Sequence, residues 1–176
     1  MTTLITNQVT NHLFQEPNLK FGMDLPAINL QRAREHGLPS YNAYRHFCGL
    51  KPMKSWEDMD GIMPNKTVKR YSDVYEHPDD IDLWSGGVSE RPLPGALVGP
   101  TFACLIALTF KEVRFGDRFW YENKGYPSTF TPAQLEEIRK TKLSRVVCDN
   151  SDDIKTIQVY AMVLPDHDIC KTKKSK

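Results

Sequence analysis

The sequence lacks several features that would place it in a broad class at once. No run approaches the roughly 20 consecutive apolar residues of a transmembrane helix. The 23 basic and 22 acidic residues leave a formal net charge of +1, without the strong basic excess of proteins that bind nucleic acids or anionic membranes. Residues 1–10 lack the basic start and apolar run of a signal peptide. We therefore expect no membrane span and no nucleic-acid partner.

Motifs that hold metal ions are also absent. The five histidines show neither HExxH nor i,i+4 spacing, and the four cysteines form no CxxC pair, so no dedicated metal site is expected. Four cysteines allow three disulfide pairings, but composition alone equally permits four buried thiols in a cytosolic protein. A glycosylation sequon begins at Asn65, which would be modified only in a secreted chain.

What is present is enough for one folded domain of mainly helical structure. The chain has 176 residues, of which 40% are hydrophobic, so it can form a core. Apolar periodicity predicts helices over residues 4–15, 25–34, 40–47, 65–75 and 100–113. A capping box formed by Thr131 and Gln134 predicts a further helix that ends at about residue 142, and residues 79–84 could form a single helical turn. Glycines and prolines predict a loop over 85–99, and residues 154–163 could form one strand. No internal repeat or interdomain linker is visible.

The predicted helix over residues 100–113 is the most apolar. Pro100 occupies a favoured first-turn position, and almost no polar face precedes Lys111, so this helix should be buried. If its packing partners lie outside this chain, the exposed apolar surface would make the isolated chain poorly soluble or prone to associate with an upstream segment.

The segment from Ile28 to Leu50, INLQRAREHGLPSYNAYRHFCGL, is unusually rich in polar hydrogen-bonding groups next to apolar ones. Two arginines, amides and an imidazole crowd residues 29–36, and the segment stops sharply at residues 37–39. One interpretation is a charged surface helix that ends at a glycine-proline stop. The other is a helix end that presses its polar groups against an anionic, planar partner while its apolar side stays buried.

This segment resembles the signature of the animal haem peroxidase superfamily, L-N-[IL]-Q-R-[GS]-R-D-H-G-L-P-x-Y-N-x-[WY]-R-x-x-C-G-L. Ala33 replaces the usual Gly or Ser, and Glu35 replaces the usual Asp. Further blocks resemble those of the family in the same order, from about residue 9 to residue 150: TNHLF at 10–14, IDLWSGG at 81–87, VGPTFACLI at 98–106, GDRFWYEN at 116–123, FTPAQL at 130–135 and LSRVVCDN at 143–150.

The resemblance covers only the C-terminal part of the family's catalytic domain. It implies a partial peroxidase domain over residues 1–170, mainly α with little β structure, and a basic, disordered tail over 171–176. Neither the family's distal G-Q-[FW]-[ILV]-x-H-D block nor its proximal-histidine block is found, and Asp166-His167-Asp168 is interpreted as an exposed turn. The complete parent would reduce hydrogen peroxide while oxidising small-molecule donors, whereas the isolated chain is predicted to be inactive. The alternative is a non-enzymatic remnant or interaction module.

The resemblance also implies a haem-supporting site without catalytic residues. Asn29 matches the asparagine that accepts a hydrogen bond from the proximal histidine, and Arg32 matches the arginine that contacts a haem propionate. Leu25 and Ile28 would supply apolar wall on the proximal side. The rival interpretation makes Asn29 a helix-start residue and Arg32 a solvated charge.

Two disulfides are implied by the same resemblance. Cys48 and Cys104 fall in blocks that the family joins, and Cys148 and Cys170 resemble its last pair. Such pairing implies an extracellular location or the secretory pathway for the parent protein.

Overall fold

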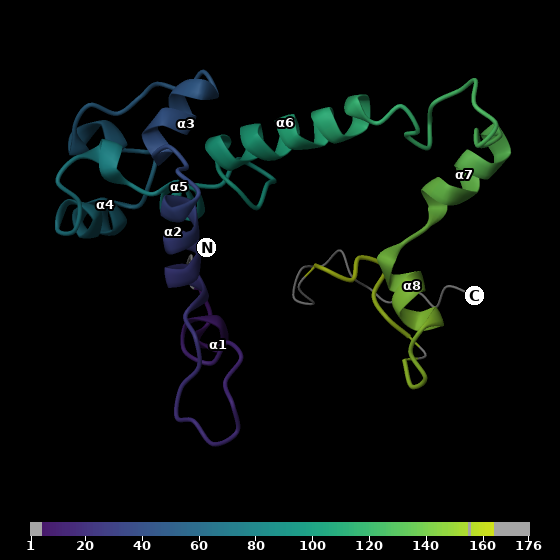
Figure 1. Ribbon diagram of the computed structural model, residues 1–176, viewed down its shortest axis with the longest axis horizontal. Coiled ribbons are helices and arrows are strands. Elements are labelled where there is room, and N and C mark those ends of the chain that lie inside the picture. The colour runs from purple at the N-terminus through teal and green to yellow at the C-terminus, as the bar shows by residue number, and fades with distance from the viewer. Residues whose placement is uncertain (1–4, 155, 164–176) are drawn as a thin grey trace. The chain divides into compact units, whose positions relative to one another are not determined.

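The computed structural model describes residues 5–154 and 156–163, and the chain divides into two compact units, Met1–Val113 and Arg114–Lys176. Every regular element in these described residues is a helix (Figure 1). An isolated antiparallel bridge joins Leu13 to Met23. The predicted mainly α fold is confirmed.

The described residues contain eight α-helices and two 3-10 helices. The first unit contains α1 (Asn7–Thr10), α2 (Leu25–Glu35), α3 (Tyr41–Phe47), η1 (Trp56–Met59), α4 (Asn65–Ser72), η2 (Pro78–Asp80), α5 (Leu83–Ser89) and most of α6 (Pro100–Gly116). The second unit contains α7 (Pro132–Lys140) and α8 (Leu143–Asp149).

Helix α2 spans nearly the predicted residues 25–34, and local contacts fix both of its ends. The Asp24 side chain caps the start by accepting a hydrogen bond of 3.2 Å from the Ala27 amide. At the other end, Gly37 adopts a φ of 64°, which glycine accepts without strain, and the Leu38 amide donates to the Ala33 carbonyl at 2.9 Å. These two ends fix the length of the helix that carries Asn29 and Arg32.

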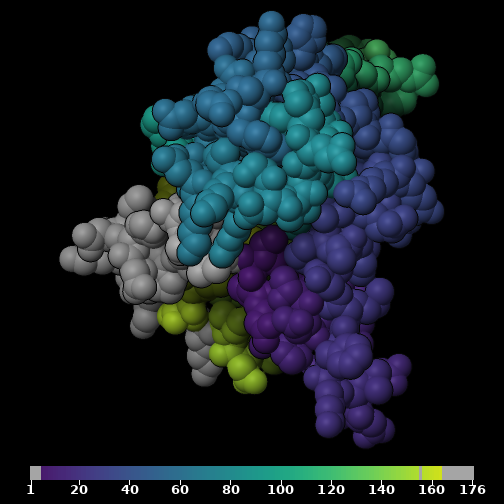
Figure 2. Space-filling model, turned by 90° about the vertical axis from the view of Figure 1, so that its left-hand side faces the viewer, coloured from purple at the N-terminus to yellow at the C-terminus, as the bar shows by residue number. Residues whose placement is uncertain are grey.

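The hydrophobic core of the first unit lies among α3, η1, α4, the segments that join them and the end of η2. Its buried side chains are Tyr41, Met53, Met59, Met63, Tyr71 and Ile81. Asn42 anchors the segment after α3, because its amide donates to the Met53 carbonyl at 2.7 Å and accepts from the Met53 amide at 2.8 Å. Figure 2 shows the blue and teal atoms of this region packed against one another.

The prediction of a helix over residues 4–15 is wrong for most of its length. Within the described residues 5–15 only Asn7–Thr10 is helical, and the chain then turns back so that Leu13 pairs with Met23. Gly22 permits this close approach, since a Cβ there would lie 2.5 Å from the Leu13 carbonyl oxygen. The backbone pairing of Leu13 with Met23 therefore outweighs the helix propensity of the residues after Thr10.

The predicted loop over residues 85–99 is wrong at its start, where α5 runs to Ser89. Gly86 and Gly87 are buried inside this helix. A Cβ on Gly86 would clash with the Tyr41 ring, and a Cβ on Gly87 would clash with the Phe102 ring. These glycines serve close helix packing rather than a turn.

Helix α6 has the predicted position but not the predicted burial. Thr101 is its one buried residue, whereas Phe110 is 69% exposed and Val113 is 55% exposed. The prediction of a helix buried nearly all round is wrong here, and the alternative of an exposed apolar face describes the helix correctly.

In the second unit the predicted capping box is confirmed, whereas the prediction of a strand is wrong. The Thr131 amide donates to Gln134 Oε1 at 2.8 Å, and the Gln134 amide donates to Thr131 Oγ1 at 3.3 Å, so α7 starts as predicted. Residues 154 and 156–163 form no strand, since no described neighbour offers an edge to pair with. The predicted tail over 171–176 and the turn at 166–168 lie outside the described residues.

Candidate functional site

A groove of about 320 Å³ lies between α2, α5 and the start of α6. Asn29 and Arg32 both line it, together with Ala33, His36, Leu38, Leu83, Trp84 and Phe102. Asn29, Arg32 and Ala33 of α2 and its C-cap residue His36 recur at positions i, i+3, i+4 and i+7, so they share one face of the helix. The structure therefore brings together the two polar residues that the sequence singled out.

Asn29 and Arg32 are the groove's candidates for polar contacts with a ligand. Asn29 is half-buried, and its amide offers both donors and an acceptor. The Arg32 side chain is 65% exposed, and its ion pair with Glu35 is long, at 3.9 Å. Such a distant, exposed partner holds the guanidinium weakly, which leaves its fork of N–H donors available to a carboxylate.

Leu25 and Ile28 occupy different places on α2. Ile28 is half-buried and lines a neighbouring hollow of about 300 Å³, to which Arg32 also contributes. Leu25 is the first residue of the helix, is half-buried and does not line the groove. The structure thus links Ile28 to the groove through Arg32 and leaves Leu25 apart from it.

His36, Trp84 and Phe102 line the groove although sequence reasoning did not select them for a site. For His36 a signal existed, because it shares the helical stripe of Asn29 and Arg32. Trp84 and Phe102 come from α5 and α6, and no local pattern in the sequence places them beside α2. The aromatic walls and the polar side chains Asn29, Arg32 and His36 suit a largely apolar ligand with anionic substituents.

A polar link ties α2 to the start of α5 behind this groove. Arg34 donates from Nε to Asp82 Oδ1 at 2.9 Å and from Nη2 to Oδ2 at 2.8 Å, and the Tyr75 hydroxyl donates to Oδ2 at 2.7 Å. The hydrogen bonds from Arg34 keep the pKa of the Asp82 carboxyl below its usual range despite burial. Burial, reinforced by Asp82, raises the pKa of Tyr75 to about 12.

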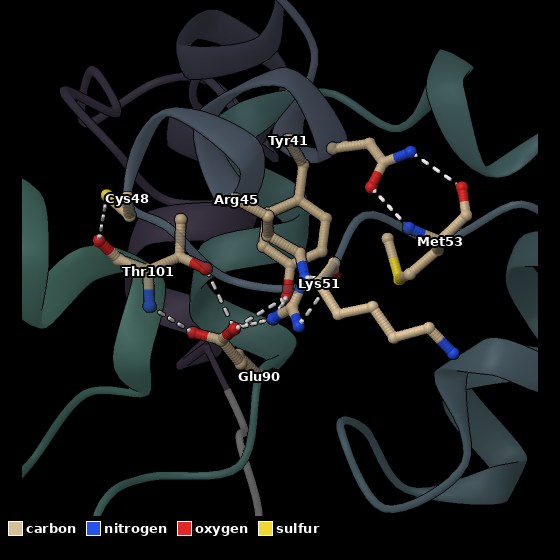
Figure 3. A network of polar contacts seen from close by, with 8 residues as sticks. Tyr41, Arg45, Cys48, Lys51, Met53, Glu90 and Thr101 are labelled. Atoms are coloured by element: carbon tan, nitrogen blue, oxygen red, sulfur yellow. Dashed lines mark hydrogen bonds and ion pairs between the residues drawn. The ribbon is translucent and has the colours of Figure 1, made fainter.

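A second, fully buried network surrounds the Glu90 carboxylate (Figure 3). It accepts hydrogen bonds from the Tyr41 hydroxyl at 2.8 Å, from Arg45 Nη1 at 2.7 Å, and from the amide and hydroxyl of Thr101, both at 2.8 Å. Burial and the Glu90 charge raise the pKa of Tyr41. The network joins α3, the end of α5 and the first turn of α6, and so fixes two of the helices that line the groove.

The disulfide that the resemblance implied between Cys48 and Cys104 is present. Its Cα atoms are 6.1 Å apart, and it joins the end of α3 to α6 beside the Glu90 network. The second implied pair stays a prediction, since Cys170 lies outside the described residues. Asn65 is exposed at the first position of α4, where an enzyme could reach it, but its glycosylation also stays a prediction.

The described residues contain no group of three or more histidine, cysteine or acidic side chains placed to hold a metal ion. None of the described helices combines the length and apolar character required to cross a membrane.

Comparison with known proteins places these features in one family. The family model described as animal haem peroxidase matches residues 1–162. The chain is 44% identical to a peroxidasin homolog of Caenorhabditis briggsae over 165 residues, which cover 93% of this chain and 12% of that protein. It is 46% identical to thyroid peroxidase of Sus scrofa over 149 residues, which cover 84% of this chain and 16% of that protein.

A solved structure agrees with the sequence relatives. Peroxidase A from Dictyostelium discoideum superposes with a TM-score of 0.67 at 35% identity, covering 87% of this chain and 28% of that one. The chain thus spans less than a third of the length of each of these relatives. The described fold and the matched residues agree, and the chain belongs to the animal haem peroxidase family.

Proposed function

We propose that this segment supports the proximal side of haem in a peroxidase that reduces hydrogen peroxide while oxidising small-molecule donors. The observation that carries the proposal is that Asn29 and Arg32 line one groove with largely apolar walls. Bound haem would supply the peroxide chemistry, while the chain's own residues bind and orient.

Asn29 and Arg32 would have separate tasks. The Asn29 amide oxygen would accept a hydrogen bond from the ring N–H of the iron-ligating histidine, which fixes the ring's tautomer and orientation. The exposed fork of Arg32 would pair with a propionate, because a carboxylate near apolar walls needs paired donors. Ile28, beside Arg32, and Leu25 would contribute apolar wall from the same helix.

The partner of this segment would be the upstream part of a peroxidase domain. The sequence from residue 1 to 176 contains no block that resembles the family's distal or proximal histidine block. We therefore assign residues 1–170 to the C-terminal part of such a domain and residues 171–176 to a tail. The Cys48–Cys104 disulfide supports an extracellular or secretory-pathway location.

The test compares Asn29→Ala and Arg32→Ala in the full-length, haem-loaded protein. We expect haem retention or turnover to fall on the order of 10-fold for Asn29→Ala, as for other groups that orient a metal ligand. Arg32→Ala should weaken haem retention more, because a propionate would lose its charged partner. Arg70→Ala, which removes an exposed arginine of α4 outside both hollows, is the matched control and should retain haem. Full haem content and activity in both test variants would contradict the assignment.

A second candidate function is a non-enzymatic interaction module. It is favoured by the exposed apolar side chains of α6, among them Phe110 and Val113, which mark an interface. An absorption spectrum of the purified chain titrated with haem separates the two. A bound-haem spectrum that Asn29→Ala or Arg32→Ala weakens supports the haem site, whereas a monodisperse chain with a cooperative thermal transition and no haem binding supports the module.

A further inference from the structure

We infer that Asp82 is a positioning residue, which orients Asn29 and Arg32 by holding α2 against α5 through Arg34. This inference rests on the proposed haem-supporting function and adds to it the residues that set the geometry of the site. Asp82 contacts neither the groove nor its two polar residues, so its effect would be transmitted through the helix.

Helix α2 has few other anchors within the described part of the chain. Ala33 is its only buried residue, and its remaining side chains are half-buried or exposed. A helix with such a small apolar contact can rotate about its axis or slide at little cost in buried area. Its orientation therefore depends on directional polar contacts.

The Arg34–Asp82 pair supplies that direction. Two parallel hydrogen bonds, of 2.9 and 2.8 Å, hold the plane of the guanidinium as well as its distance from the carboxylate. The Asp82 side chain is only 8% exposed, and the Tyr75 hydroxyl takes a further position on Oδ2 at 2.7 Å, so the carboxylate itself is fixed.

The same pair connects the two walls of the groove. Arg34 projects from α2 away from the stripe that carries Asn29, Arg32 and His36. Asp82 directly precedes Leu83 and Trp84, which line the groove from α5. A shift of α2 relative to Asp82 would therefore change the distance between the polar and aromatic walls.

The experiment uses the full-length protein with Asp82→Asn and Arg34→Lys. Asp82→Asn removes the charge, whereas Arg34→Lys keeps the charge and loses the two-bond fork. The control is Asp58→Asn, which breaks the Lys51–Asp58 ion pair of 3.0 Å in the same unit but on another element. The measurements are amide hydrogen exchange across residues 25–36, haem retention and the iron reduction potential.

We expect both test variants to raise amide hydrogen exchange in α2 selectively and to lower haem retention on the order of 10-fold. They should also raise the reduction potential of the iron, because a weaker hydrogen bond from the proximal histidine to Asn29 makes that histidine a poorer electron donor to the iron. Asp58→Asn should change none of these. Unchanged α2 exchange and potential, or exchange that rises equally across the whole unit, overturns the positioning role. A wild-type protein that binds no haem overturns the proposed function, and this inference with it.

Discussion

At the scale of single residues, Glu90 shows how hydrogen bonds and an ion pair stabilise one buried charge. Its side chain is only 1% exposed, and an uncompensated carboxylate there would be costly. Four hydrogen bonds, one of them from the Arg45 guanidinium, surround it instead. Gly99 adds room, since a Cβ on it would collide with the Glu90 side chain. One residue thus organises the junction of three helices.

Glu90→Gln should destabilise the protein strongly. The change keeps the shape of the side chain but leaves the Arg45 guanidinium buried without its counter-charge, at a cost of about 3 kcal/mol in the free energy of unfolding. Urea unfolding of the purified protein measures it. Glu57→Gln, at an exposed position on η1, is the control and should leave the midpoint unchanged. A Glu90→Gln midpoint equal to wild type would show that the ion pair contributes nothing net.

At the scale of elements, helix α5 contacts both α3 and α6 and contributes residues to the wall of the groove. Its two glycines let it lie against the Tyr41 ring of α3 on one side and the Phe102 ring of α6 on another. Its first residues supply part of the groove wall, and the residue before it receives the ion pair from α2. Close packing at Gly86 and Gly87 therefore determines both core and site.

Gly87→Ala should cost about 1–3 kcal/mol of stability, because the new methyl group overpacks against Phe102. Since Phe102 lines the groove, haem content of the full-length protein should fall as well. The measurements are the thermal midpoint and the ratio of haem to protein absorbance. Gly116→Ala is the matched control, because no atom lies within 4 Å of its Cβ position and alanine favours the helix. Equal behaviour of the two variants would refute close packing at Gly87.

At the scale of the whole molecule, the chain combines a small core with a large exposed apolar surface. The core cluster holds six buried residues, while α6 exposes several large side chains, among them Ile106, Phe110 and Val113. A disulfide between residues 56 positions apart therefore has a large share in holding α3 to α6.

Reduction of the Cys48–Cys104 disulfide should lower the free energy of unfolding by about 4 kcal/mol, because the open chain regains the entropy of a long loop. Urea unfolding with and without reductant measures this loss. The Cys48→Ser/Cys104→Ser variant should start from the lower stability, and any remaining response to reductant would report on Cys148. Non-reducing peptide mapping tests both implied pairs, and four free thiols in secreted material would contradict them.

The isolated 176-residue chain should show no peroxidase turnover above that of free haem. No residue in it matches the family's distal histidine or iron ligand, so neither the proton transfer nor the ligation that turnover needs is provided. Donor oxidation by the purified chain with added haem is the assay. Turnover well above free haem that is lost on changing His36 or His46 would refute the prediction.

Local signals in the sequence were sufficient for the elements whose ends depend on a few neighbouring residues. The stop at Gly37 and the Thr131 capping box each act within one turn of helix, so the end of α2 and the start of α7 could be predicted closely. The ordered blocks of the peroxidase signature were likewise readable without coordinates, because they depend on residue identity alone.

Tertiary structure decided the features that depend on distant residues. The meeting of Leu13 with Met23 shortened α1, and the rings of Tyr41 and Phe102 made the glycines of α5 helical rather than part of a loop. The ion pair between Arg34 and Asp82 joins positions 48 residues apart, and the groove likewise takes its walls from three helices. Such contacts form only when the chain folds back on itself. Residue spacing along the sequence therefore determined helices such as α2 and α7 and the polar stripe of α2, while long-range packing determined α1, α5 and what that stripe faces.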